Sequence, residues 1–146
     1  MFPEKQPWRR RLRIAEAPGH DRMTTHEDKV ATVQAYVDAF AKGSADAVAE
    51  LYAEACTVED PVGAAPIVGR DAVRAFYVRS MQMGAKLTLQ GPVRTAADFA
   101  AFAFSVAIPS GDGTMQIEVI DTFQFDDAGK VVAMRAYWGP PNIRMP

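Results

Sequence analysis

The sequence is poor in the residues on which several common chemistries depend. It contains one cysteine, Cys56, so an internal disulfide and a multi-cysteine metal site are excluded, and a reducing compartment such as the cytoplasm is expected. Its two histidines, His20 and His26, both precede the body of the predicted domain. Nucleophilic catalysis by a Ser-His-Asp or Cys-His set, a histidine-based metal site and a histidine general base are therefore disfavoured.

The sequence also lacks the signals of phosphate, nucleic-acid and membrane binding. It contains neither a GxGxxG motif after a strand nor a GxxxxGKS/T motif, the two glycine-rich loops that bind nucleotide phosphates. The formal net charge is -2, so no overall basic field attracts nucleic acid or an anionic membrane. The one basic cluster, Trp8-Arg9-Arg10-Arg11-Leu12-Arg13, has no apolar core of signal-peptide length. We expect no nucleic-acid partner and no membrane association.

The length of 146 residues predicts one domain with one core. Residues 1–22 are basic and interrupted by prolines, which predicts a flexible N-terminal extension rather than part of the fold. An arm that contacts nucleic acid or lipid is the alternative for this segment. Residues 23–146 are expected to form the domain, with Met23 as its natural start.

The first half of the domain has the apolar spacing of helices. Thr24 followed three residues later by Glu27 is a capping-box pattern that predicts the start of a first helix, and Gly43 predicts its end. The residues of its expected buried stripe recur every three or four positions: Val30, Val33, Tyr36, Val37 and Phe40. Tyr36 therefore faces the interior.

Two further helices are expected to add inward tyrosines. Ser44 or Asp46 can cap a second helix, and a third is predicted from Gly69-Arg70-Asp71 to Gly84. The expected buried residues are Ala47, Val48, Leu51 and Tyr52 in the second helix and Val73, Phe76, Tyr77 and Met81 in the third. Tyr52 and Tyr77 thus join Tyr36 inside the fold.

Beyond Gly84 the apolar pattern changes to alternation, which predicts strands separated by hairpin turns. The expected strands are Lys86–Arg94, Phe99–Ile108, Thr114–Phe125 and Val131–Trp138. Three helices followed by a run of strands predict an α+β domain, with the helices on one side of a curved, mainly antiparallel sheet that can enclose a pocket.

One strand carries an acid on its apolar face. The odd positions of Thr114–Phe125 are Met115, Ile117, Val119, Asp121, Phe123 and Phe125. Because side chains alternate across a strand, Asp121 is expected to be buried among apolar groups, where the pKa of a carboxyl rises and the neutral acid can donate a hydrogen bond. A bulge, or an ion pair with an arginine such as Arg135, is the alternative.

A second pair of acids lies in Val58-Glu59-Asp60-Pro61-Val62-Gly63. Proline disfavours a helical conformation for Asp60, so adjacent side chains should point to opposite sides. We expect Asp60 to point inward and Glu59 outward, and a solvated turn acid is the alternative. Inward carboxylates and tyrosines in an apolar shell suit proton abstraction beside a carbonyl, which requires neither a metal nor a cofactor.

Several separate segments resemble one family in order and spacing. They are the Tyr36 helix, Leu51-Tyr52-Ala53-Glu54-Ala55-Cys56-Thr57-Val58-Glu59-Asp60-Pro61-Val62-Gly63, Pro66-Ile67-Val68-Gly69-Arg70, Ala75-Phe76-Tyr77, Gly91-Pro92-Val93-Arg94, Val119-Ile120-Asp121, Phe125-Asp126 and Met134-Arg135-Ala136-Tyr137-Trp138. From about Lys29 to Trp138 the chain resembles the steroid Δ5-3-ketoisomerases (ketosteroid isomerases) of the NTF2-like, SnoaL-like superfamily.

The resemblance implies a role for each matching residue. It makes Asp60 the proton-shuttling base, Tyr36 the oxyanion-hole tyrosine and Asp121 the protonated acid that donates the second hydrogen bond to the oxyanion. Tyr52 and Tyr77 match tyrosines whose hydroxyls continue from the first. The implied substrate-binding walls are Phe40, Phe76, Phe102, Phe104, Val119, Met134 and Trp138.

The resemblance further implies a cone-shaped fold, a homodimer, no cofactor and a small apolar polycyclic ketone as substrate. The implied reaction moves a β,γ double bond into conjugation with a 3-keto group by intramolecular proton transfer. The chain departs from the family at its basic prefix, at Glu118, at Phe102 and in its Gly139-Pro140-Pro141 ending, all of which bear on substrate shape. An NTF2-like cyclase or isomerase acting on another polycyclic ketone and a non-catalytic binder of apolar ligands remain the alternatives.

Overall fold

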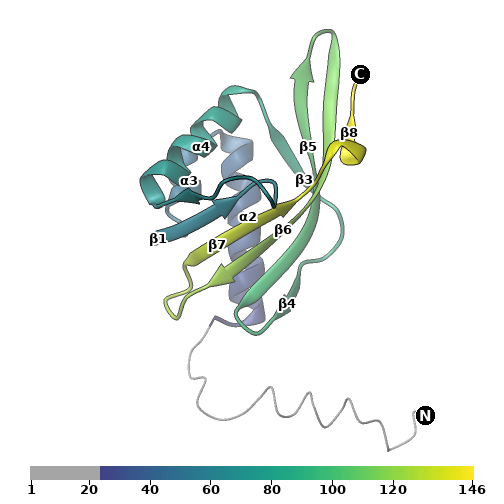
Figure 1. Cartoon of the computed structure of the whole chain (residues 1–146). Coiled ribbons are helices and arrows are strands. Elements are labelled where there is room, and N and C mark those ends of the chain that lie inside the picture. Colours follow the sequence, from purple (N-terminus) through teal and green to yellow (C-terminus); the bar gives the residue numbers. More distant parts are fainter. Residues whose placement is uncertain (1–23) are drawn as a thin grey trace, which may run out of the picture.

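A computed structural model describes residues 24–146 of the chain. The predicted N-terminal extension, residues 1–22, lies outside the described residues. Within 24–146, three α-helices are followed or interleaved by eight strands and one short 3₁₀ helix. The helices gather on one face of a curved sheet, and a long hairpin extends past them (Figure 1). The predicted α+β architecture is confirmed.

The helices begin and end close to the predicted positions. They are α2 (His26–Lys42), α3 (Ala45–Ala49) and α4 (Arg70–Gln82). The capping box at the start of α2 lies one residue later than expected: the Thr25 hydroxyl accepts from the Asp28 N–H, and the Asp28 carboxylate accepts from the Thr25 N–H. The expected pair Thr24 and Glu27 overlaps the observed pair Thr25 and Asp28 in the sequence, and Asp28 takes the position expected for Glu27.

Tyr52 corrects the prediction for the second helix. Helix α3 ends at Ala49 and Tyr52 begins a strand, β1 (Tyr52–Glu59), which the helical spacing had hidden. This strand pairs in parallel with β7 (Val131–Tyr137), with Glu59 opposite Arg135. Tyr52 is nevertheless fully buried, as expected. A parallel partner lies far away in the sequence, so no local pattern announces it.

The eight strands of residues 24–146 form one sheet, whose main path runs in the order β2-β1-β7-β6-β5-β3, with β4 paired to β5 and β8 paired to β6. The strands other than β1 and β7 are β2 (Ile67–Val68), β3 (Lys86–Leu89), β4 (Arg94–Ala96), β5 (Phe99–Ser110), β6 (Gly113–Phe125) and β8 (Ile143–Arg144), and the 3₁₀ helix η1 spans Pro140–Asn142. All their pairings are antiparallel. The single strand expected over Lys86–Arg94 is split, because Gly91 has φ 84° and Pro92 has no N–H to pair.

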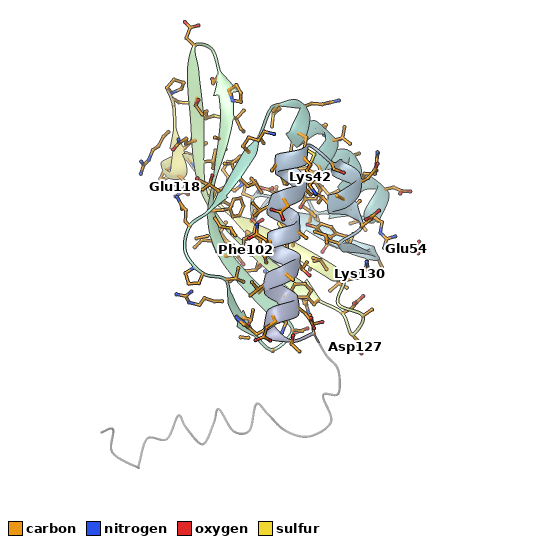
Figure 2. All side chains as sticks on the ribbon, turned by 180° about the vertical axis from the view of Figure 1, so that it is seen from behind. Lys42, Glu54, Phe102, Glu118, Asp127 and Lys130 are labelled. Atoms are coloured by element: carbon orange, nitrogen blue, oxygen red, sulfur yellow. The ribbon has the colours of Figure 1, made fainter. Side chains whose placement is uncertain are left out.

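The β5–β6 hairpin sets the geometry of the concave face. Its register places Phe102 opposite Asp121, Phe104 opposite Val119, Val106 opposite Ile117 and Ile108 opposite Met115, without interruption. Helix α2 covers the first of these rows: the Tyr36 and Phe102 ring centroids are 6.1 Å apart, and Phe102 lies beside α2 in the reverse view (Figure 2). The later rows extend beyond the helix. No helix within residues 24–146 has the length and apolarity needed to cross a membrane.

Candidate active site

A cavity of about 260 Å³ lies between the concave face of the sheet and helices α2 and α4. Three residues with chemistry to offer open onto it from different elements: Tyr36 from α2, Asp121 from β6 and Asp60 from the turn after β1. The fold therefore brings side chains that lie 24 to 85 positions apart in the sequence into one apolar enclosure. The full lining comprises Tyr36, Phe40, Asp60, Phe76, Tyr77, Ser80, Met83, Ala85, Leu87, Phe104, Val106, Ile108, Met115, Ile117, Val119, Asp121 and Trp138.

Three tyrosine hydroxyls form a chain that ends at the cavity. The Tyr36 hydroxyl donates to the Tyr77 hydroxyl at 3.4 Å, and the Tyr77 and Tyr52 hydroxyls are 2.6 Å apart. Tyr36 and Tyr77 line the cavity, whereas Tyr52 lies behind them in the core. Burial raises the pKa of all three phenols well above the ordinary value, so each remains protonated at neutral pH and can donate a hydrogen bond.

Asp121 is 1% exposed, and both of its carboxyl oxygens are buried without a hydrogen-bond partner in the structure. The uninterrupted β5–β6 register excludes a bulge at this position. Arg135 is directed elsewhere, since its Nε donates to Glu59 Oε2 at 3.1 Å. Burial first, and the nearby Asp60 carboxylate second, raise the pKa of Asp121 well above the usual range. A neutral carboxylic acid with an unused O–H therefore lies at the cavity wall.

Asp60 and Glu59 point to opposite sides, as the sequence predicted. Asp60 lines the cavity, and its Oδ1 accepts a hydrogen bond from Trp138 Nε1 at 2.6 Å. Burial raises the pKa of Asp60, and the Trp138 hydrogen bond partly offsets this rise. Glu59 accepts from the Gly63 N–H and from Arg135, and these contacts lower its pKa. The two adjacent acids thus differ in environment, and their pKa values shift in opposite directions.

Most, but not all, of the expected wall residues reach the cavity. Phe40, Phe76, Phe104, Val119 and Trp138 line it. Phe102 and Met134 do not: both are core residues, 2% and 1% exposed. Helix α2 covers Phe102 through Tyr36, and Met134 lies opposite Phe123 in the β6–β7 pairing, where the ring is fully buried.

Eight of the seventeen residues that line the cavity were not expected there from the sequence. The unassigned residues are Ser80, Met83, Ala85, Leu87, Val106, Ile108, Met115 and Ile117. A signal for several of them was present, because Val106 and Ile108 share the alternating face of Phe104, and Met115 and Ile117 share that of Asp121. Ser80 and Met83 reach the cavity from the end of α4, which no strand pattern indicates.

The arrangement can transfer a proton next to a carbonyl group. It offers one ionisable base, Asp60, and two neutral donors, Tyr36 and Asp121, around an apolar space. Within residues 24–146 no group of three or more histidine, cysteine or acidic side chains is positioned to hold a metal ion. The side chains at hand are those that withdraw a proton and stabilise an enolate oxygen.

The chain is similar to a family model, to a curated protein and to a solved structure. Residues 33–134 match the model of the SnoaL-like domain family. The chain is 44% identical over 114 residues to a steroid Delta-isomerase of Nocardioides simplex, a match that covers 77% of this chain and 91% of that protein. Among solved structures, it is similar to the epoxide hydrolase/cyclase-like enzyme SalBIII, which has a role in pyran ring formation in the polyether salinomycin. That similarity has a TM-score of 0.78 and 25% identity, over 85% of this chain and 100% of the other.

Replacing Trp138 by phenylalanine is expected to raise the pKa of Asp60. The indole N–H donates to Oδ1 and stabilises the ionised carboxyl, so its removal disfavours the charged form. The pKa can be followed by ¹³C NMR of the labelled carboxyl group. Tyr137→Phe, at the neighbouring half-exposed position, is the control and should leave it unchanged. An unaltered or lower pKa in Trp138→Phe would contradict the assignment.

Asp121→Asn is expected to change how stability depends on pH. A carboxyl with a raised folded-state pKa binds more protons in the folded chain, so wild-type stability falls as pH rises above about 4, the unfolded value, towards the folded pKa. The variant lacks this dependence. Urea unfolding at several pH values should therefore shift in favour of Asp121→Asn as pH increases. Parallel curves for the two proteins would show that Asp121 is not held neutral.

Proposed function

The chain belongs to the SnoaL-like family, and on that premise we propose that it is a cofactor-independent steroid Δ-isomerase. The observation that carries the proposal is the convergence of Asp60, Tyr36 and Asp121 on one apolar cavity. The similarity to the steroid Delta-isomerase of Nocardioides simplex over most of both chains supports the same reaction class. The proposed substrate is a steroid with a 3-keto group and a β,γ double bond.

Asp60 is proposed to act as the base. Its carboxylate removes a proton from the carbon between the ketone and the double bond, which leaves a dienolate and a protonated Asp60. Asp60 then returns the same proton two carbons further along, so the double bond becomes conjugated and the carboxylate is regenerated. Partial burial suits this role because it raises the pKa of Asp60 and makes the carboxylate a stronger base.

Tyr36 and Asp121 are proposed to donate hydrogen bonds to the dienolate oxygen. Both are protonated and buried at the cavity wall, and the Asp121 carboxyl has no hydrogen-bond partner among residues 24–146 that would compete for its proton. The Asp121 O–H is free to donate before charge develops and needs no rearrangement of a hydrogen bond within the site. The Tyr36 O–H donates to Tyr77 in the structure, so we propose that it turns to the dienolate when substrate binds and then accepts from the Tyr77 hydroxyl, which Tyr52 contacts in turn.

The apolar walls support a flat, hydrophobic substrate. Phe40, Phe76, Phe104, Val119 and Trp138 surround the catalytic residues with aromatic and aliphatic surface. Excluding water from this space strengthens the hydrogen bonds to a developing negative charge. The single buried cysteine supports a cytoplasmic location for the enzyme.

Cyclisation of another polycyclic substrate is the second candidate function. The fold shared with SalBIII favours it, because that protein is epoxide hydrolase/cyclase-like and has the same overall architecture at a TM-score of 0.78. Two inward carboxyl groups could also serve such a reaction. A non-catalytic binding module is less well supported, because two inward carboxyl groups lower stability without improving the binding of an apolar ligand.

The wild-type protein is expected to convert a Δ5-3-ketosteroid into its conjugated isomer, which absorbs in the ultraviolet. Asp60→Asn, which cannot take the proton, should lower the rate by about 10²–10⁴. Tyr36→Phe removes one oxyanion donor and should lower it by about 10²–10³. Asp38→Asn, on the exposed side of α2, is the matched control and should retain full activity.

A flat absorbance trace from folded wild-type protein would contradict the isomerase proposal. Near-full activity in both Asp60→Asn and Tyr36→Phe would contradict the residue assignments instead. Binding of a phenolic steroid distinguishes an isomerase from a non-catalytic binder, since a site complementary to the dienolate binds the phenol more tightly than the matching ketone.

The enzyme is also proposed to be a homodimer that associates through the outer face of the sheet. Ile120 and Tyr137 are direct cross-strand neighbours on this face and are 50% and 45% exposed. Phe99 adds a third large apolar side chain at 44% exposure. Water-exposed apolar residues on the broad face of a sheet are typical of an interface between subunits.

Ile120→Glu is expected to convert a dimer into a monomer. The substitution introduces a carboxylate into the centre of the proposed interface, where it would lose its hydration. Light scattering coupled to size-exclusion chromatography gives the mass directly. Val68→Glu, on the edge strand β2 and 68% exposed, is the control and should remain dimeric. A monomeric wild-type protein at micromolar concentration would contradict the proposal.

A further inference from the structure

The cavity continues well beyond the residues that perform the proposed chemistry. On β6 the inward row runs from Asp121 through Val119 and Ile117 to Met115. At about 3.4 Å per residue, Met115 lies about 20 Å along the strand from Asp121. A four-ring steroid nucleus measures roughly 10 Å from its 3-keto oxygen to C17, given C–C bonds of about 1.5 Å. A ketone held at Asp121 therefore leaves the far part of the cavity unfilled by the rings.

This far part, which we call the distal groove, is a strip of three strands. Its floor consists of inward side chains at neighbouring register positions: Leu87 lies opposite Val106, and Val106 and Ile108 lie opposite Ile117 and Met115. All of these side chains are aliphatic or thioether groups, and all line the cavity. Ala85, immediately before β3, leaves space beside them because its side chain is a single methyl group.

Several side chains of the distal groove remain partly exposed to water, although Ala85 and Ile108 are buried. Leu87, Val106, Met115 and Ile117 are only partly buried, and Met83 at the end of α4 is 56% exposed. Figure 1 shows that the β5–β6 hairpin extends past the helices. An apolar ligand that continued from the cavity would remove this surface from water.

The distal groove offers no polar side chain that can hold an oxygen substituent. Ser80 has the one hydroxyl group among the cavity residues outside the tyrosines, and it donates its hydrogen to the Phe76 carbonyl oxygen at 3.2 Å. Its remaining lone pairs cannot donate to a ketone. A carbonyl group at the distal end of the substrate would therefore lose its hydrogen bonds with water without replacement.

We propose that the enzyme selects 3-keto-Δ5 steroids that carry an apolar alkyl side chain on C17 over those with a 17-keto group. The proposal rests on the isomerase function proposed above, since that function fixes the ketone at Asp121 and Tyr36. The rings occupy the cavity near the catalytic residues, and the alkyl chain lies along the distal groove between Met83 and the β5–β6 hairpin.

The test compares three substrates that share one ring system: cholest-5-en-3-one, androst-5-en-3-one and androst-5-ene-3,17-dione. Rates are measured by absorbance under the same cyclodextrin concentration. We expect kcat/KM to be about tenfold or more higher for cholest-5-en-3-one than for the dione, because even one buried methylene contributes about that much discrimination. The compound without a C17 substituent separates the gain from the chain from the penalty on the ketone, and should lie between the two.

A pair of neighbouring variants locates the effect. Met115→Gln keeps the side-chain length but places an amide in the distal groove, and should lower kcat/KM for cholest-5-en-3-one by about fivefold or more while changing the value for the dione by less than about twofold. Gln116→Met, the next residue on the opposite, exposed face of β6, is the control and should change neither. Thermal unfolding by circular dichroism verifies that both variants fold.

The outcomes separate the two proposals. Equal or faster turnover of the dione, or an equal loss on both substrates in Met115→Gln, would overturn the alkyl-chain proposal and leave the isomerase function intact. Absence of turnover on all three steroids by the folded protein would overturn the isomerase function and the inference with it. Alkyl-chain preference that Met115→Gln abolishes supports both.

Discussion

The site depends on keeping a proton on a carboxyl group buried in an apolar wall. Asp121 can donate a hydrogen bond only while it is neutral, and it remains neutral because burial penalises its charged form and no cation neutralises that charge. A guanidinium beside it would reverse this situation by stabilising the carboxylate. Arg135, the arginine considered as a partner for Asp121, lies on the other face of the sheet because it pairs with Thr122, whereas Asp121 pairs with Ala136. There its Nε donates to Glu59.

The adjacent acids Glu59 and Asp60 lie on opposite sides of the sheet edge, in different environments. Strand β1 ends with Glu59 on the outer side, opposite Arg135 on β7, and the chain then turns so that Asp60 faces the cavity. The Val62 N–H donates to the Ala136 carbonyl oxygen at 2.8 Å, which anchors this turn to β7. Trp138, two residues after Ala136, donates a hydrogen bond to the Asp60 carboxylate. The parallel pairing of β1 and β7 places Asp60 and its indole partner side by side.

Much of the fold and of the candidate site could be predicted from local sequence patterns, and the exceptions have physical causes. The alternation of β6 predicted the burial of Asp121, and helical spacing predicted the burial of Tyr36 and Tyr77, because each signal lies within one element. Tyr52 was expected on a helix and lies on a strand, since five residues of α3 give too short a period to distinguish the two. The roles of Phe102 and Met134 depend on which inward residues a helix covers, and packing between distant elements determines that. The same limitation concealed Ser80 and Met83.

The β5–β6 hairpin separates the length of the cavity from its chemistry. Beyond the row of Phe104 and Val119 the hairpin is bordered by β3 on one side and by β8 on the other, so its backbone is paired even where no helix supports it. The length of the groove therefore depends on the length of the hairpin, in steps of two residues, because inward positions recur every second residue. Insertion of two residues into each of β5 and β6 would lengthen the groove by about 7 Å while preserving every inward position. A relative could change the reach of its substrate in this way without altering a catalytic residue.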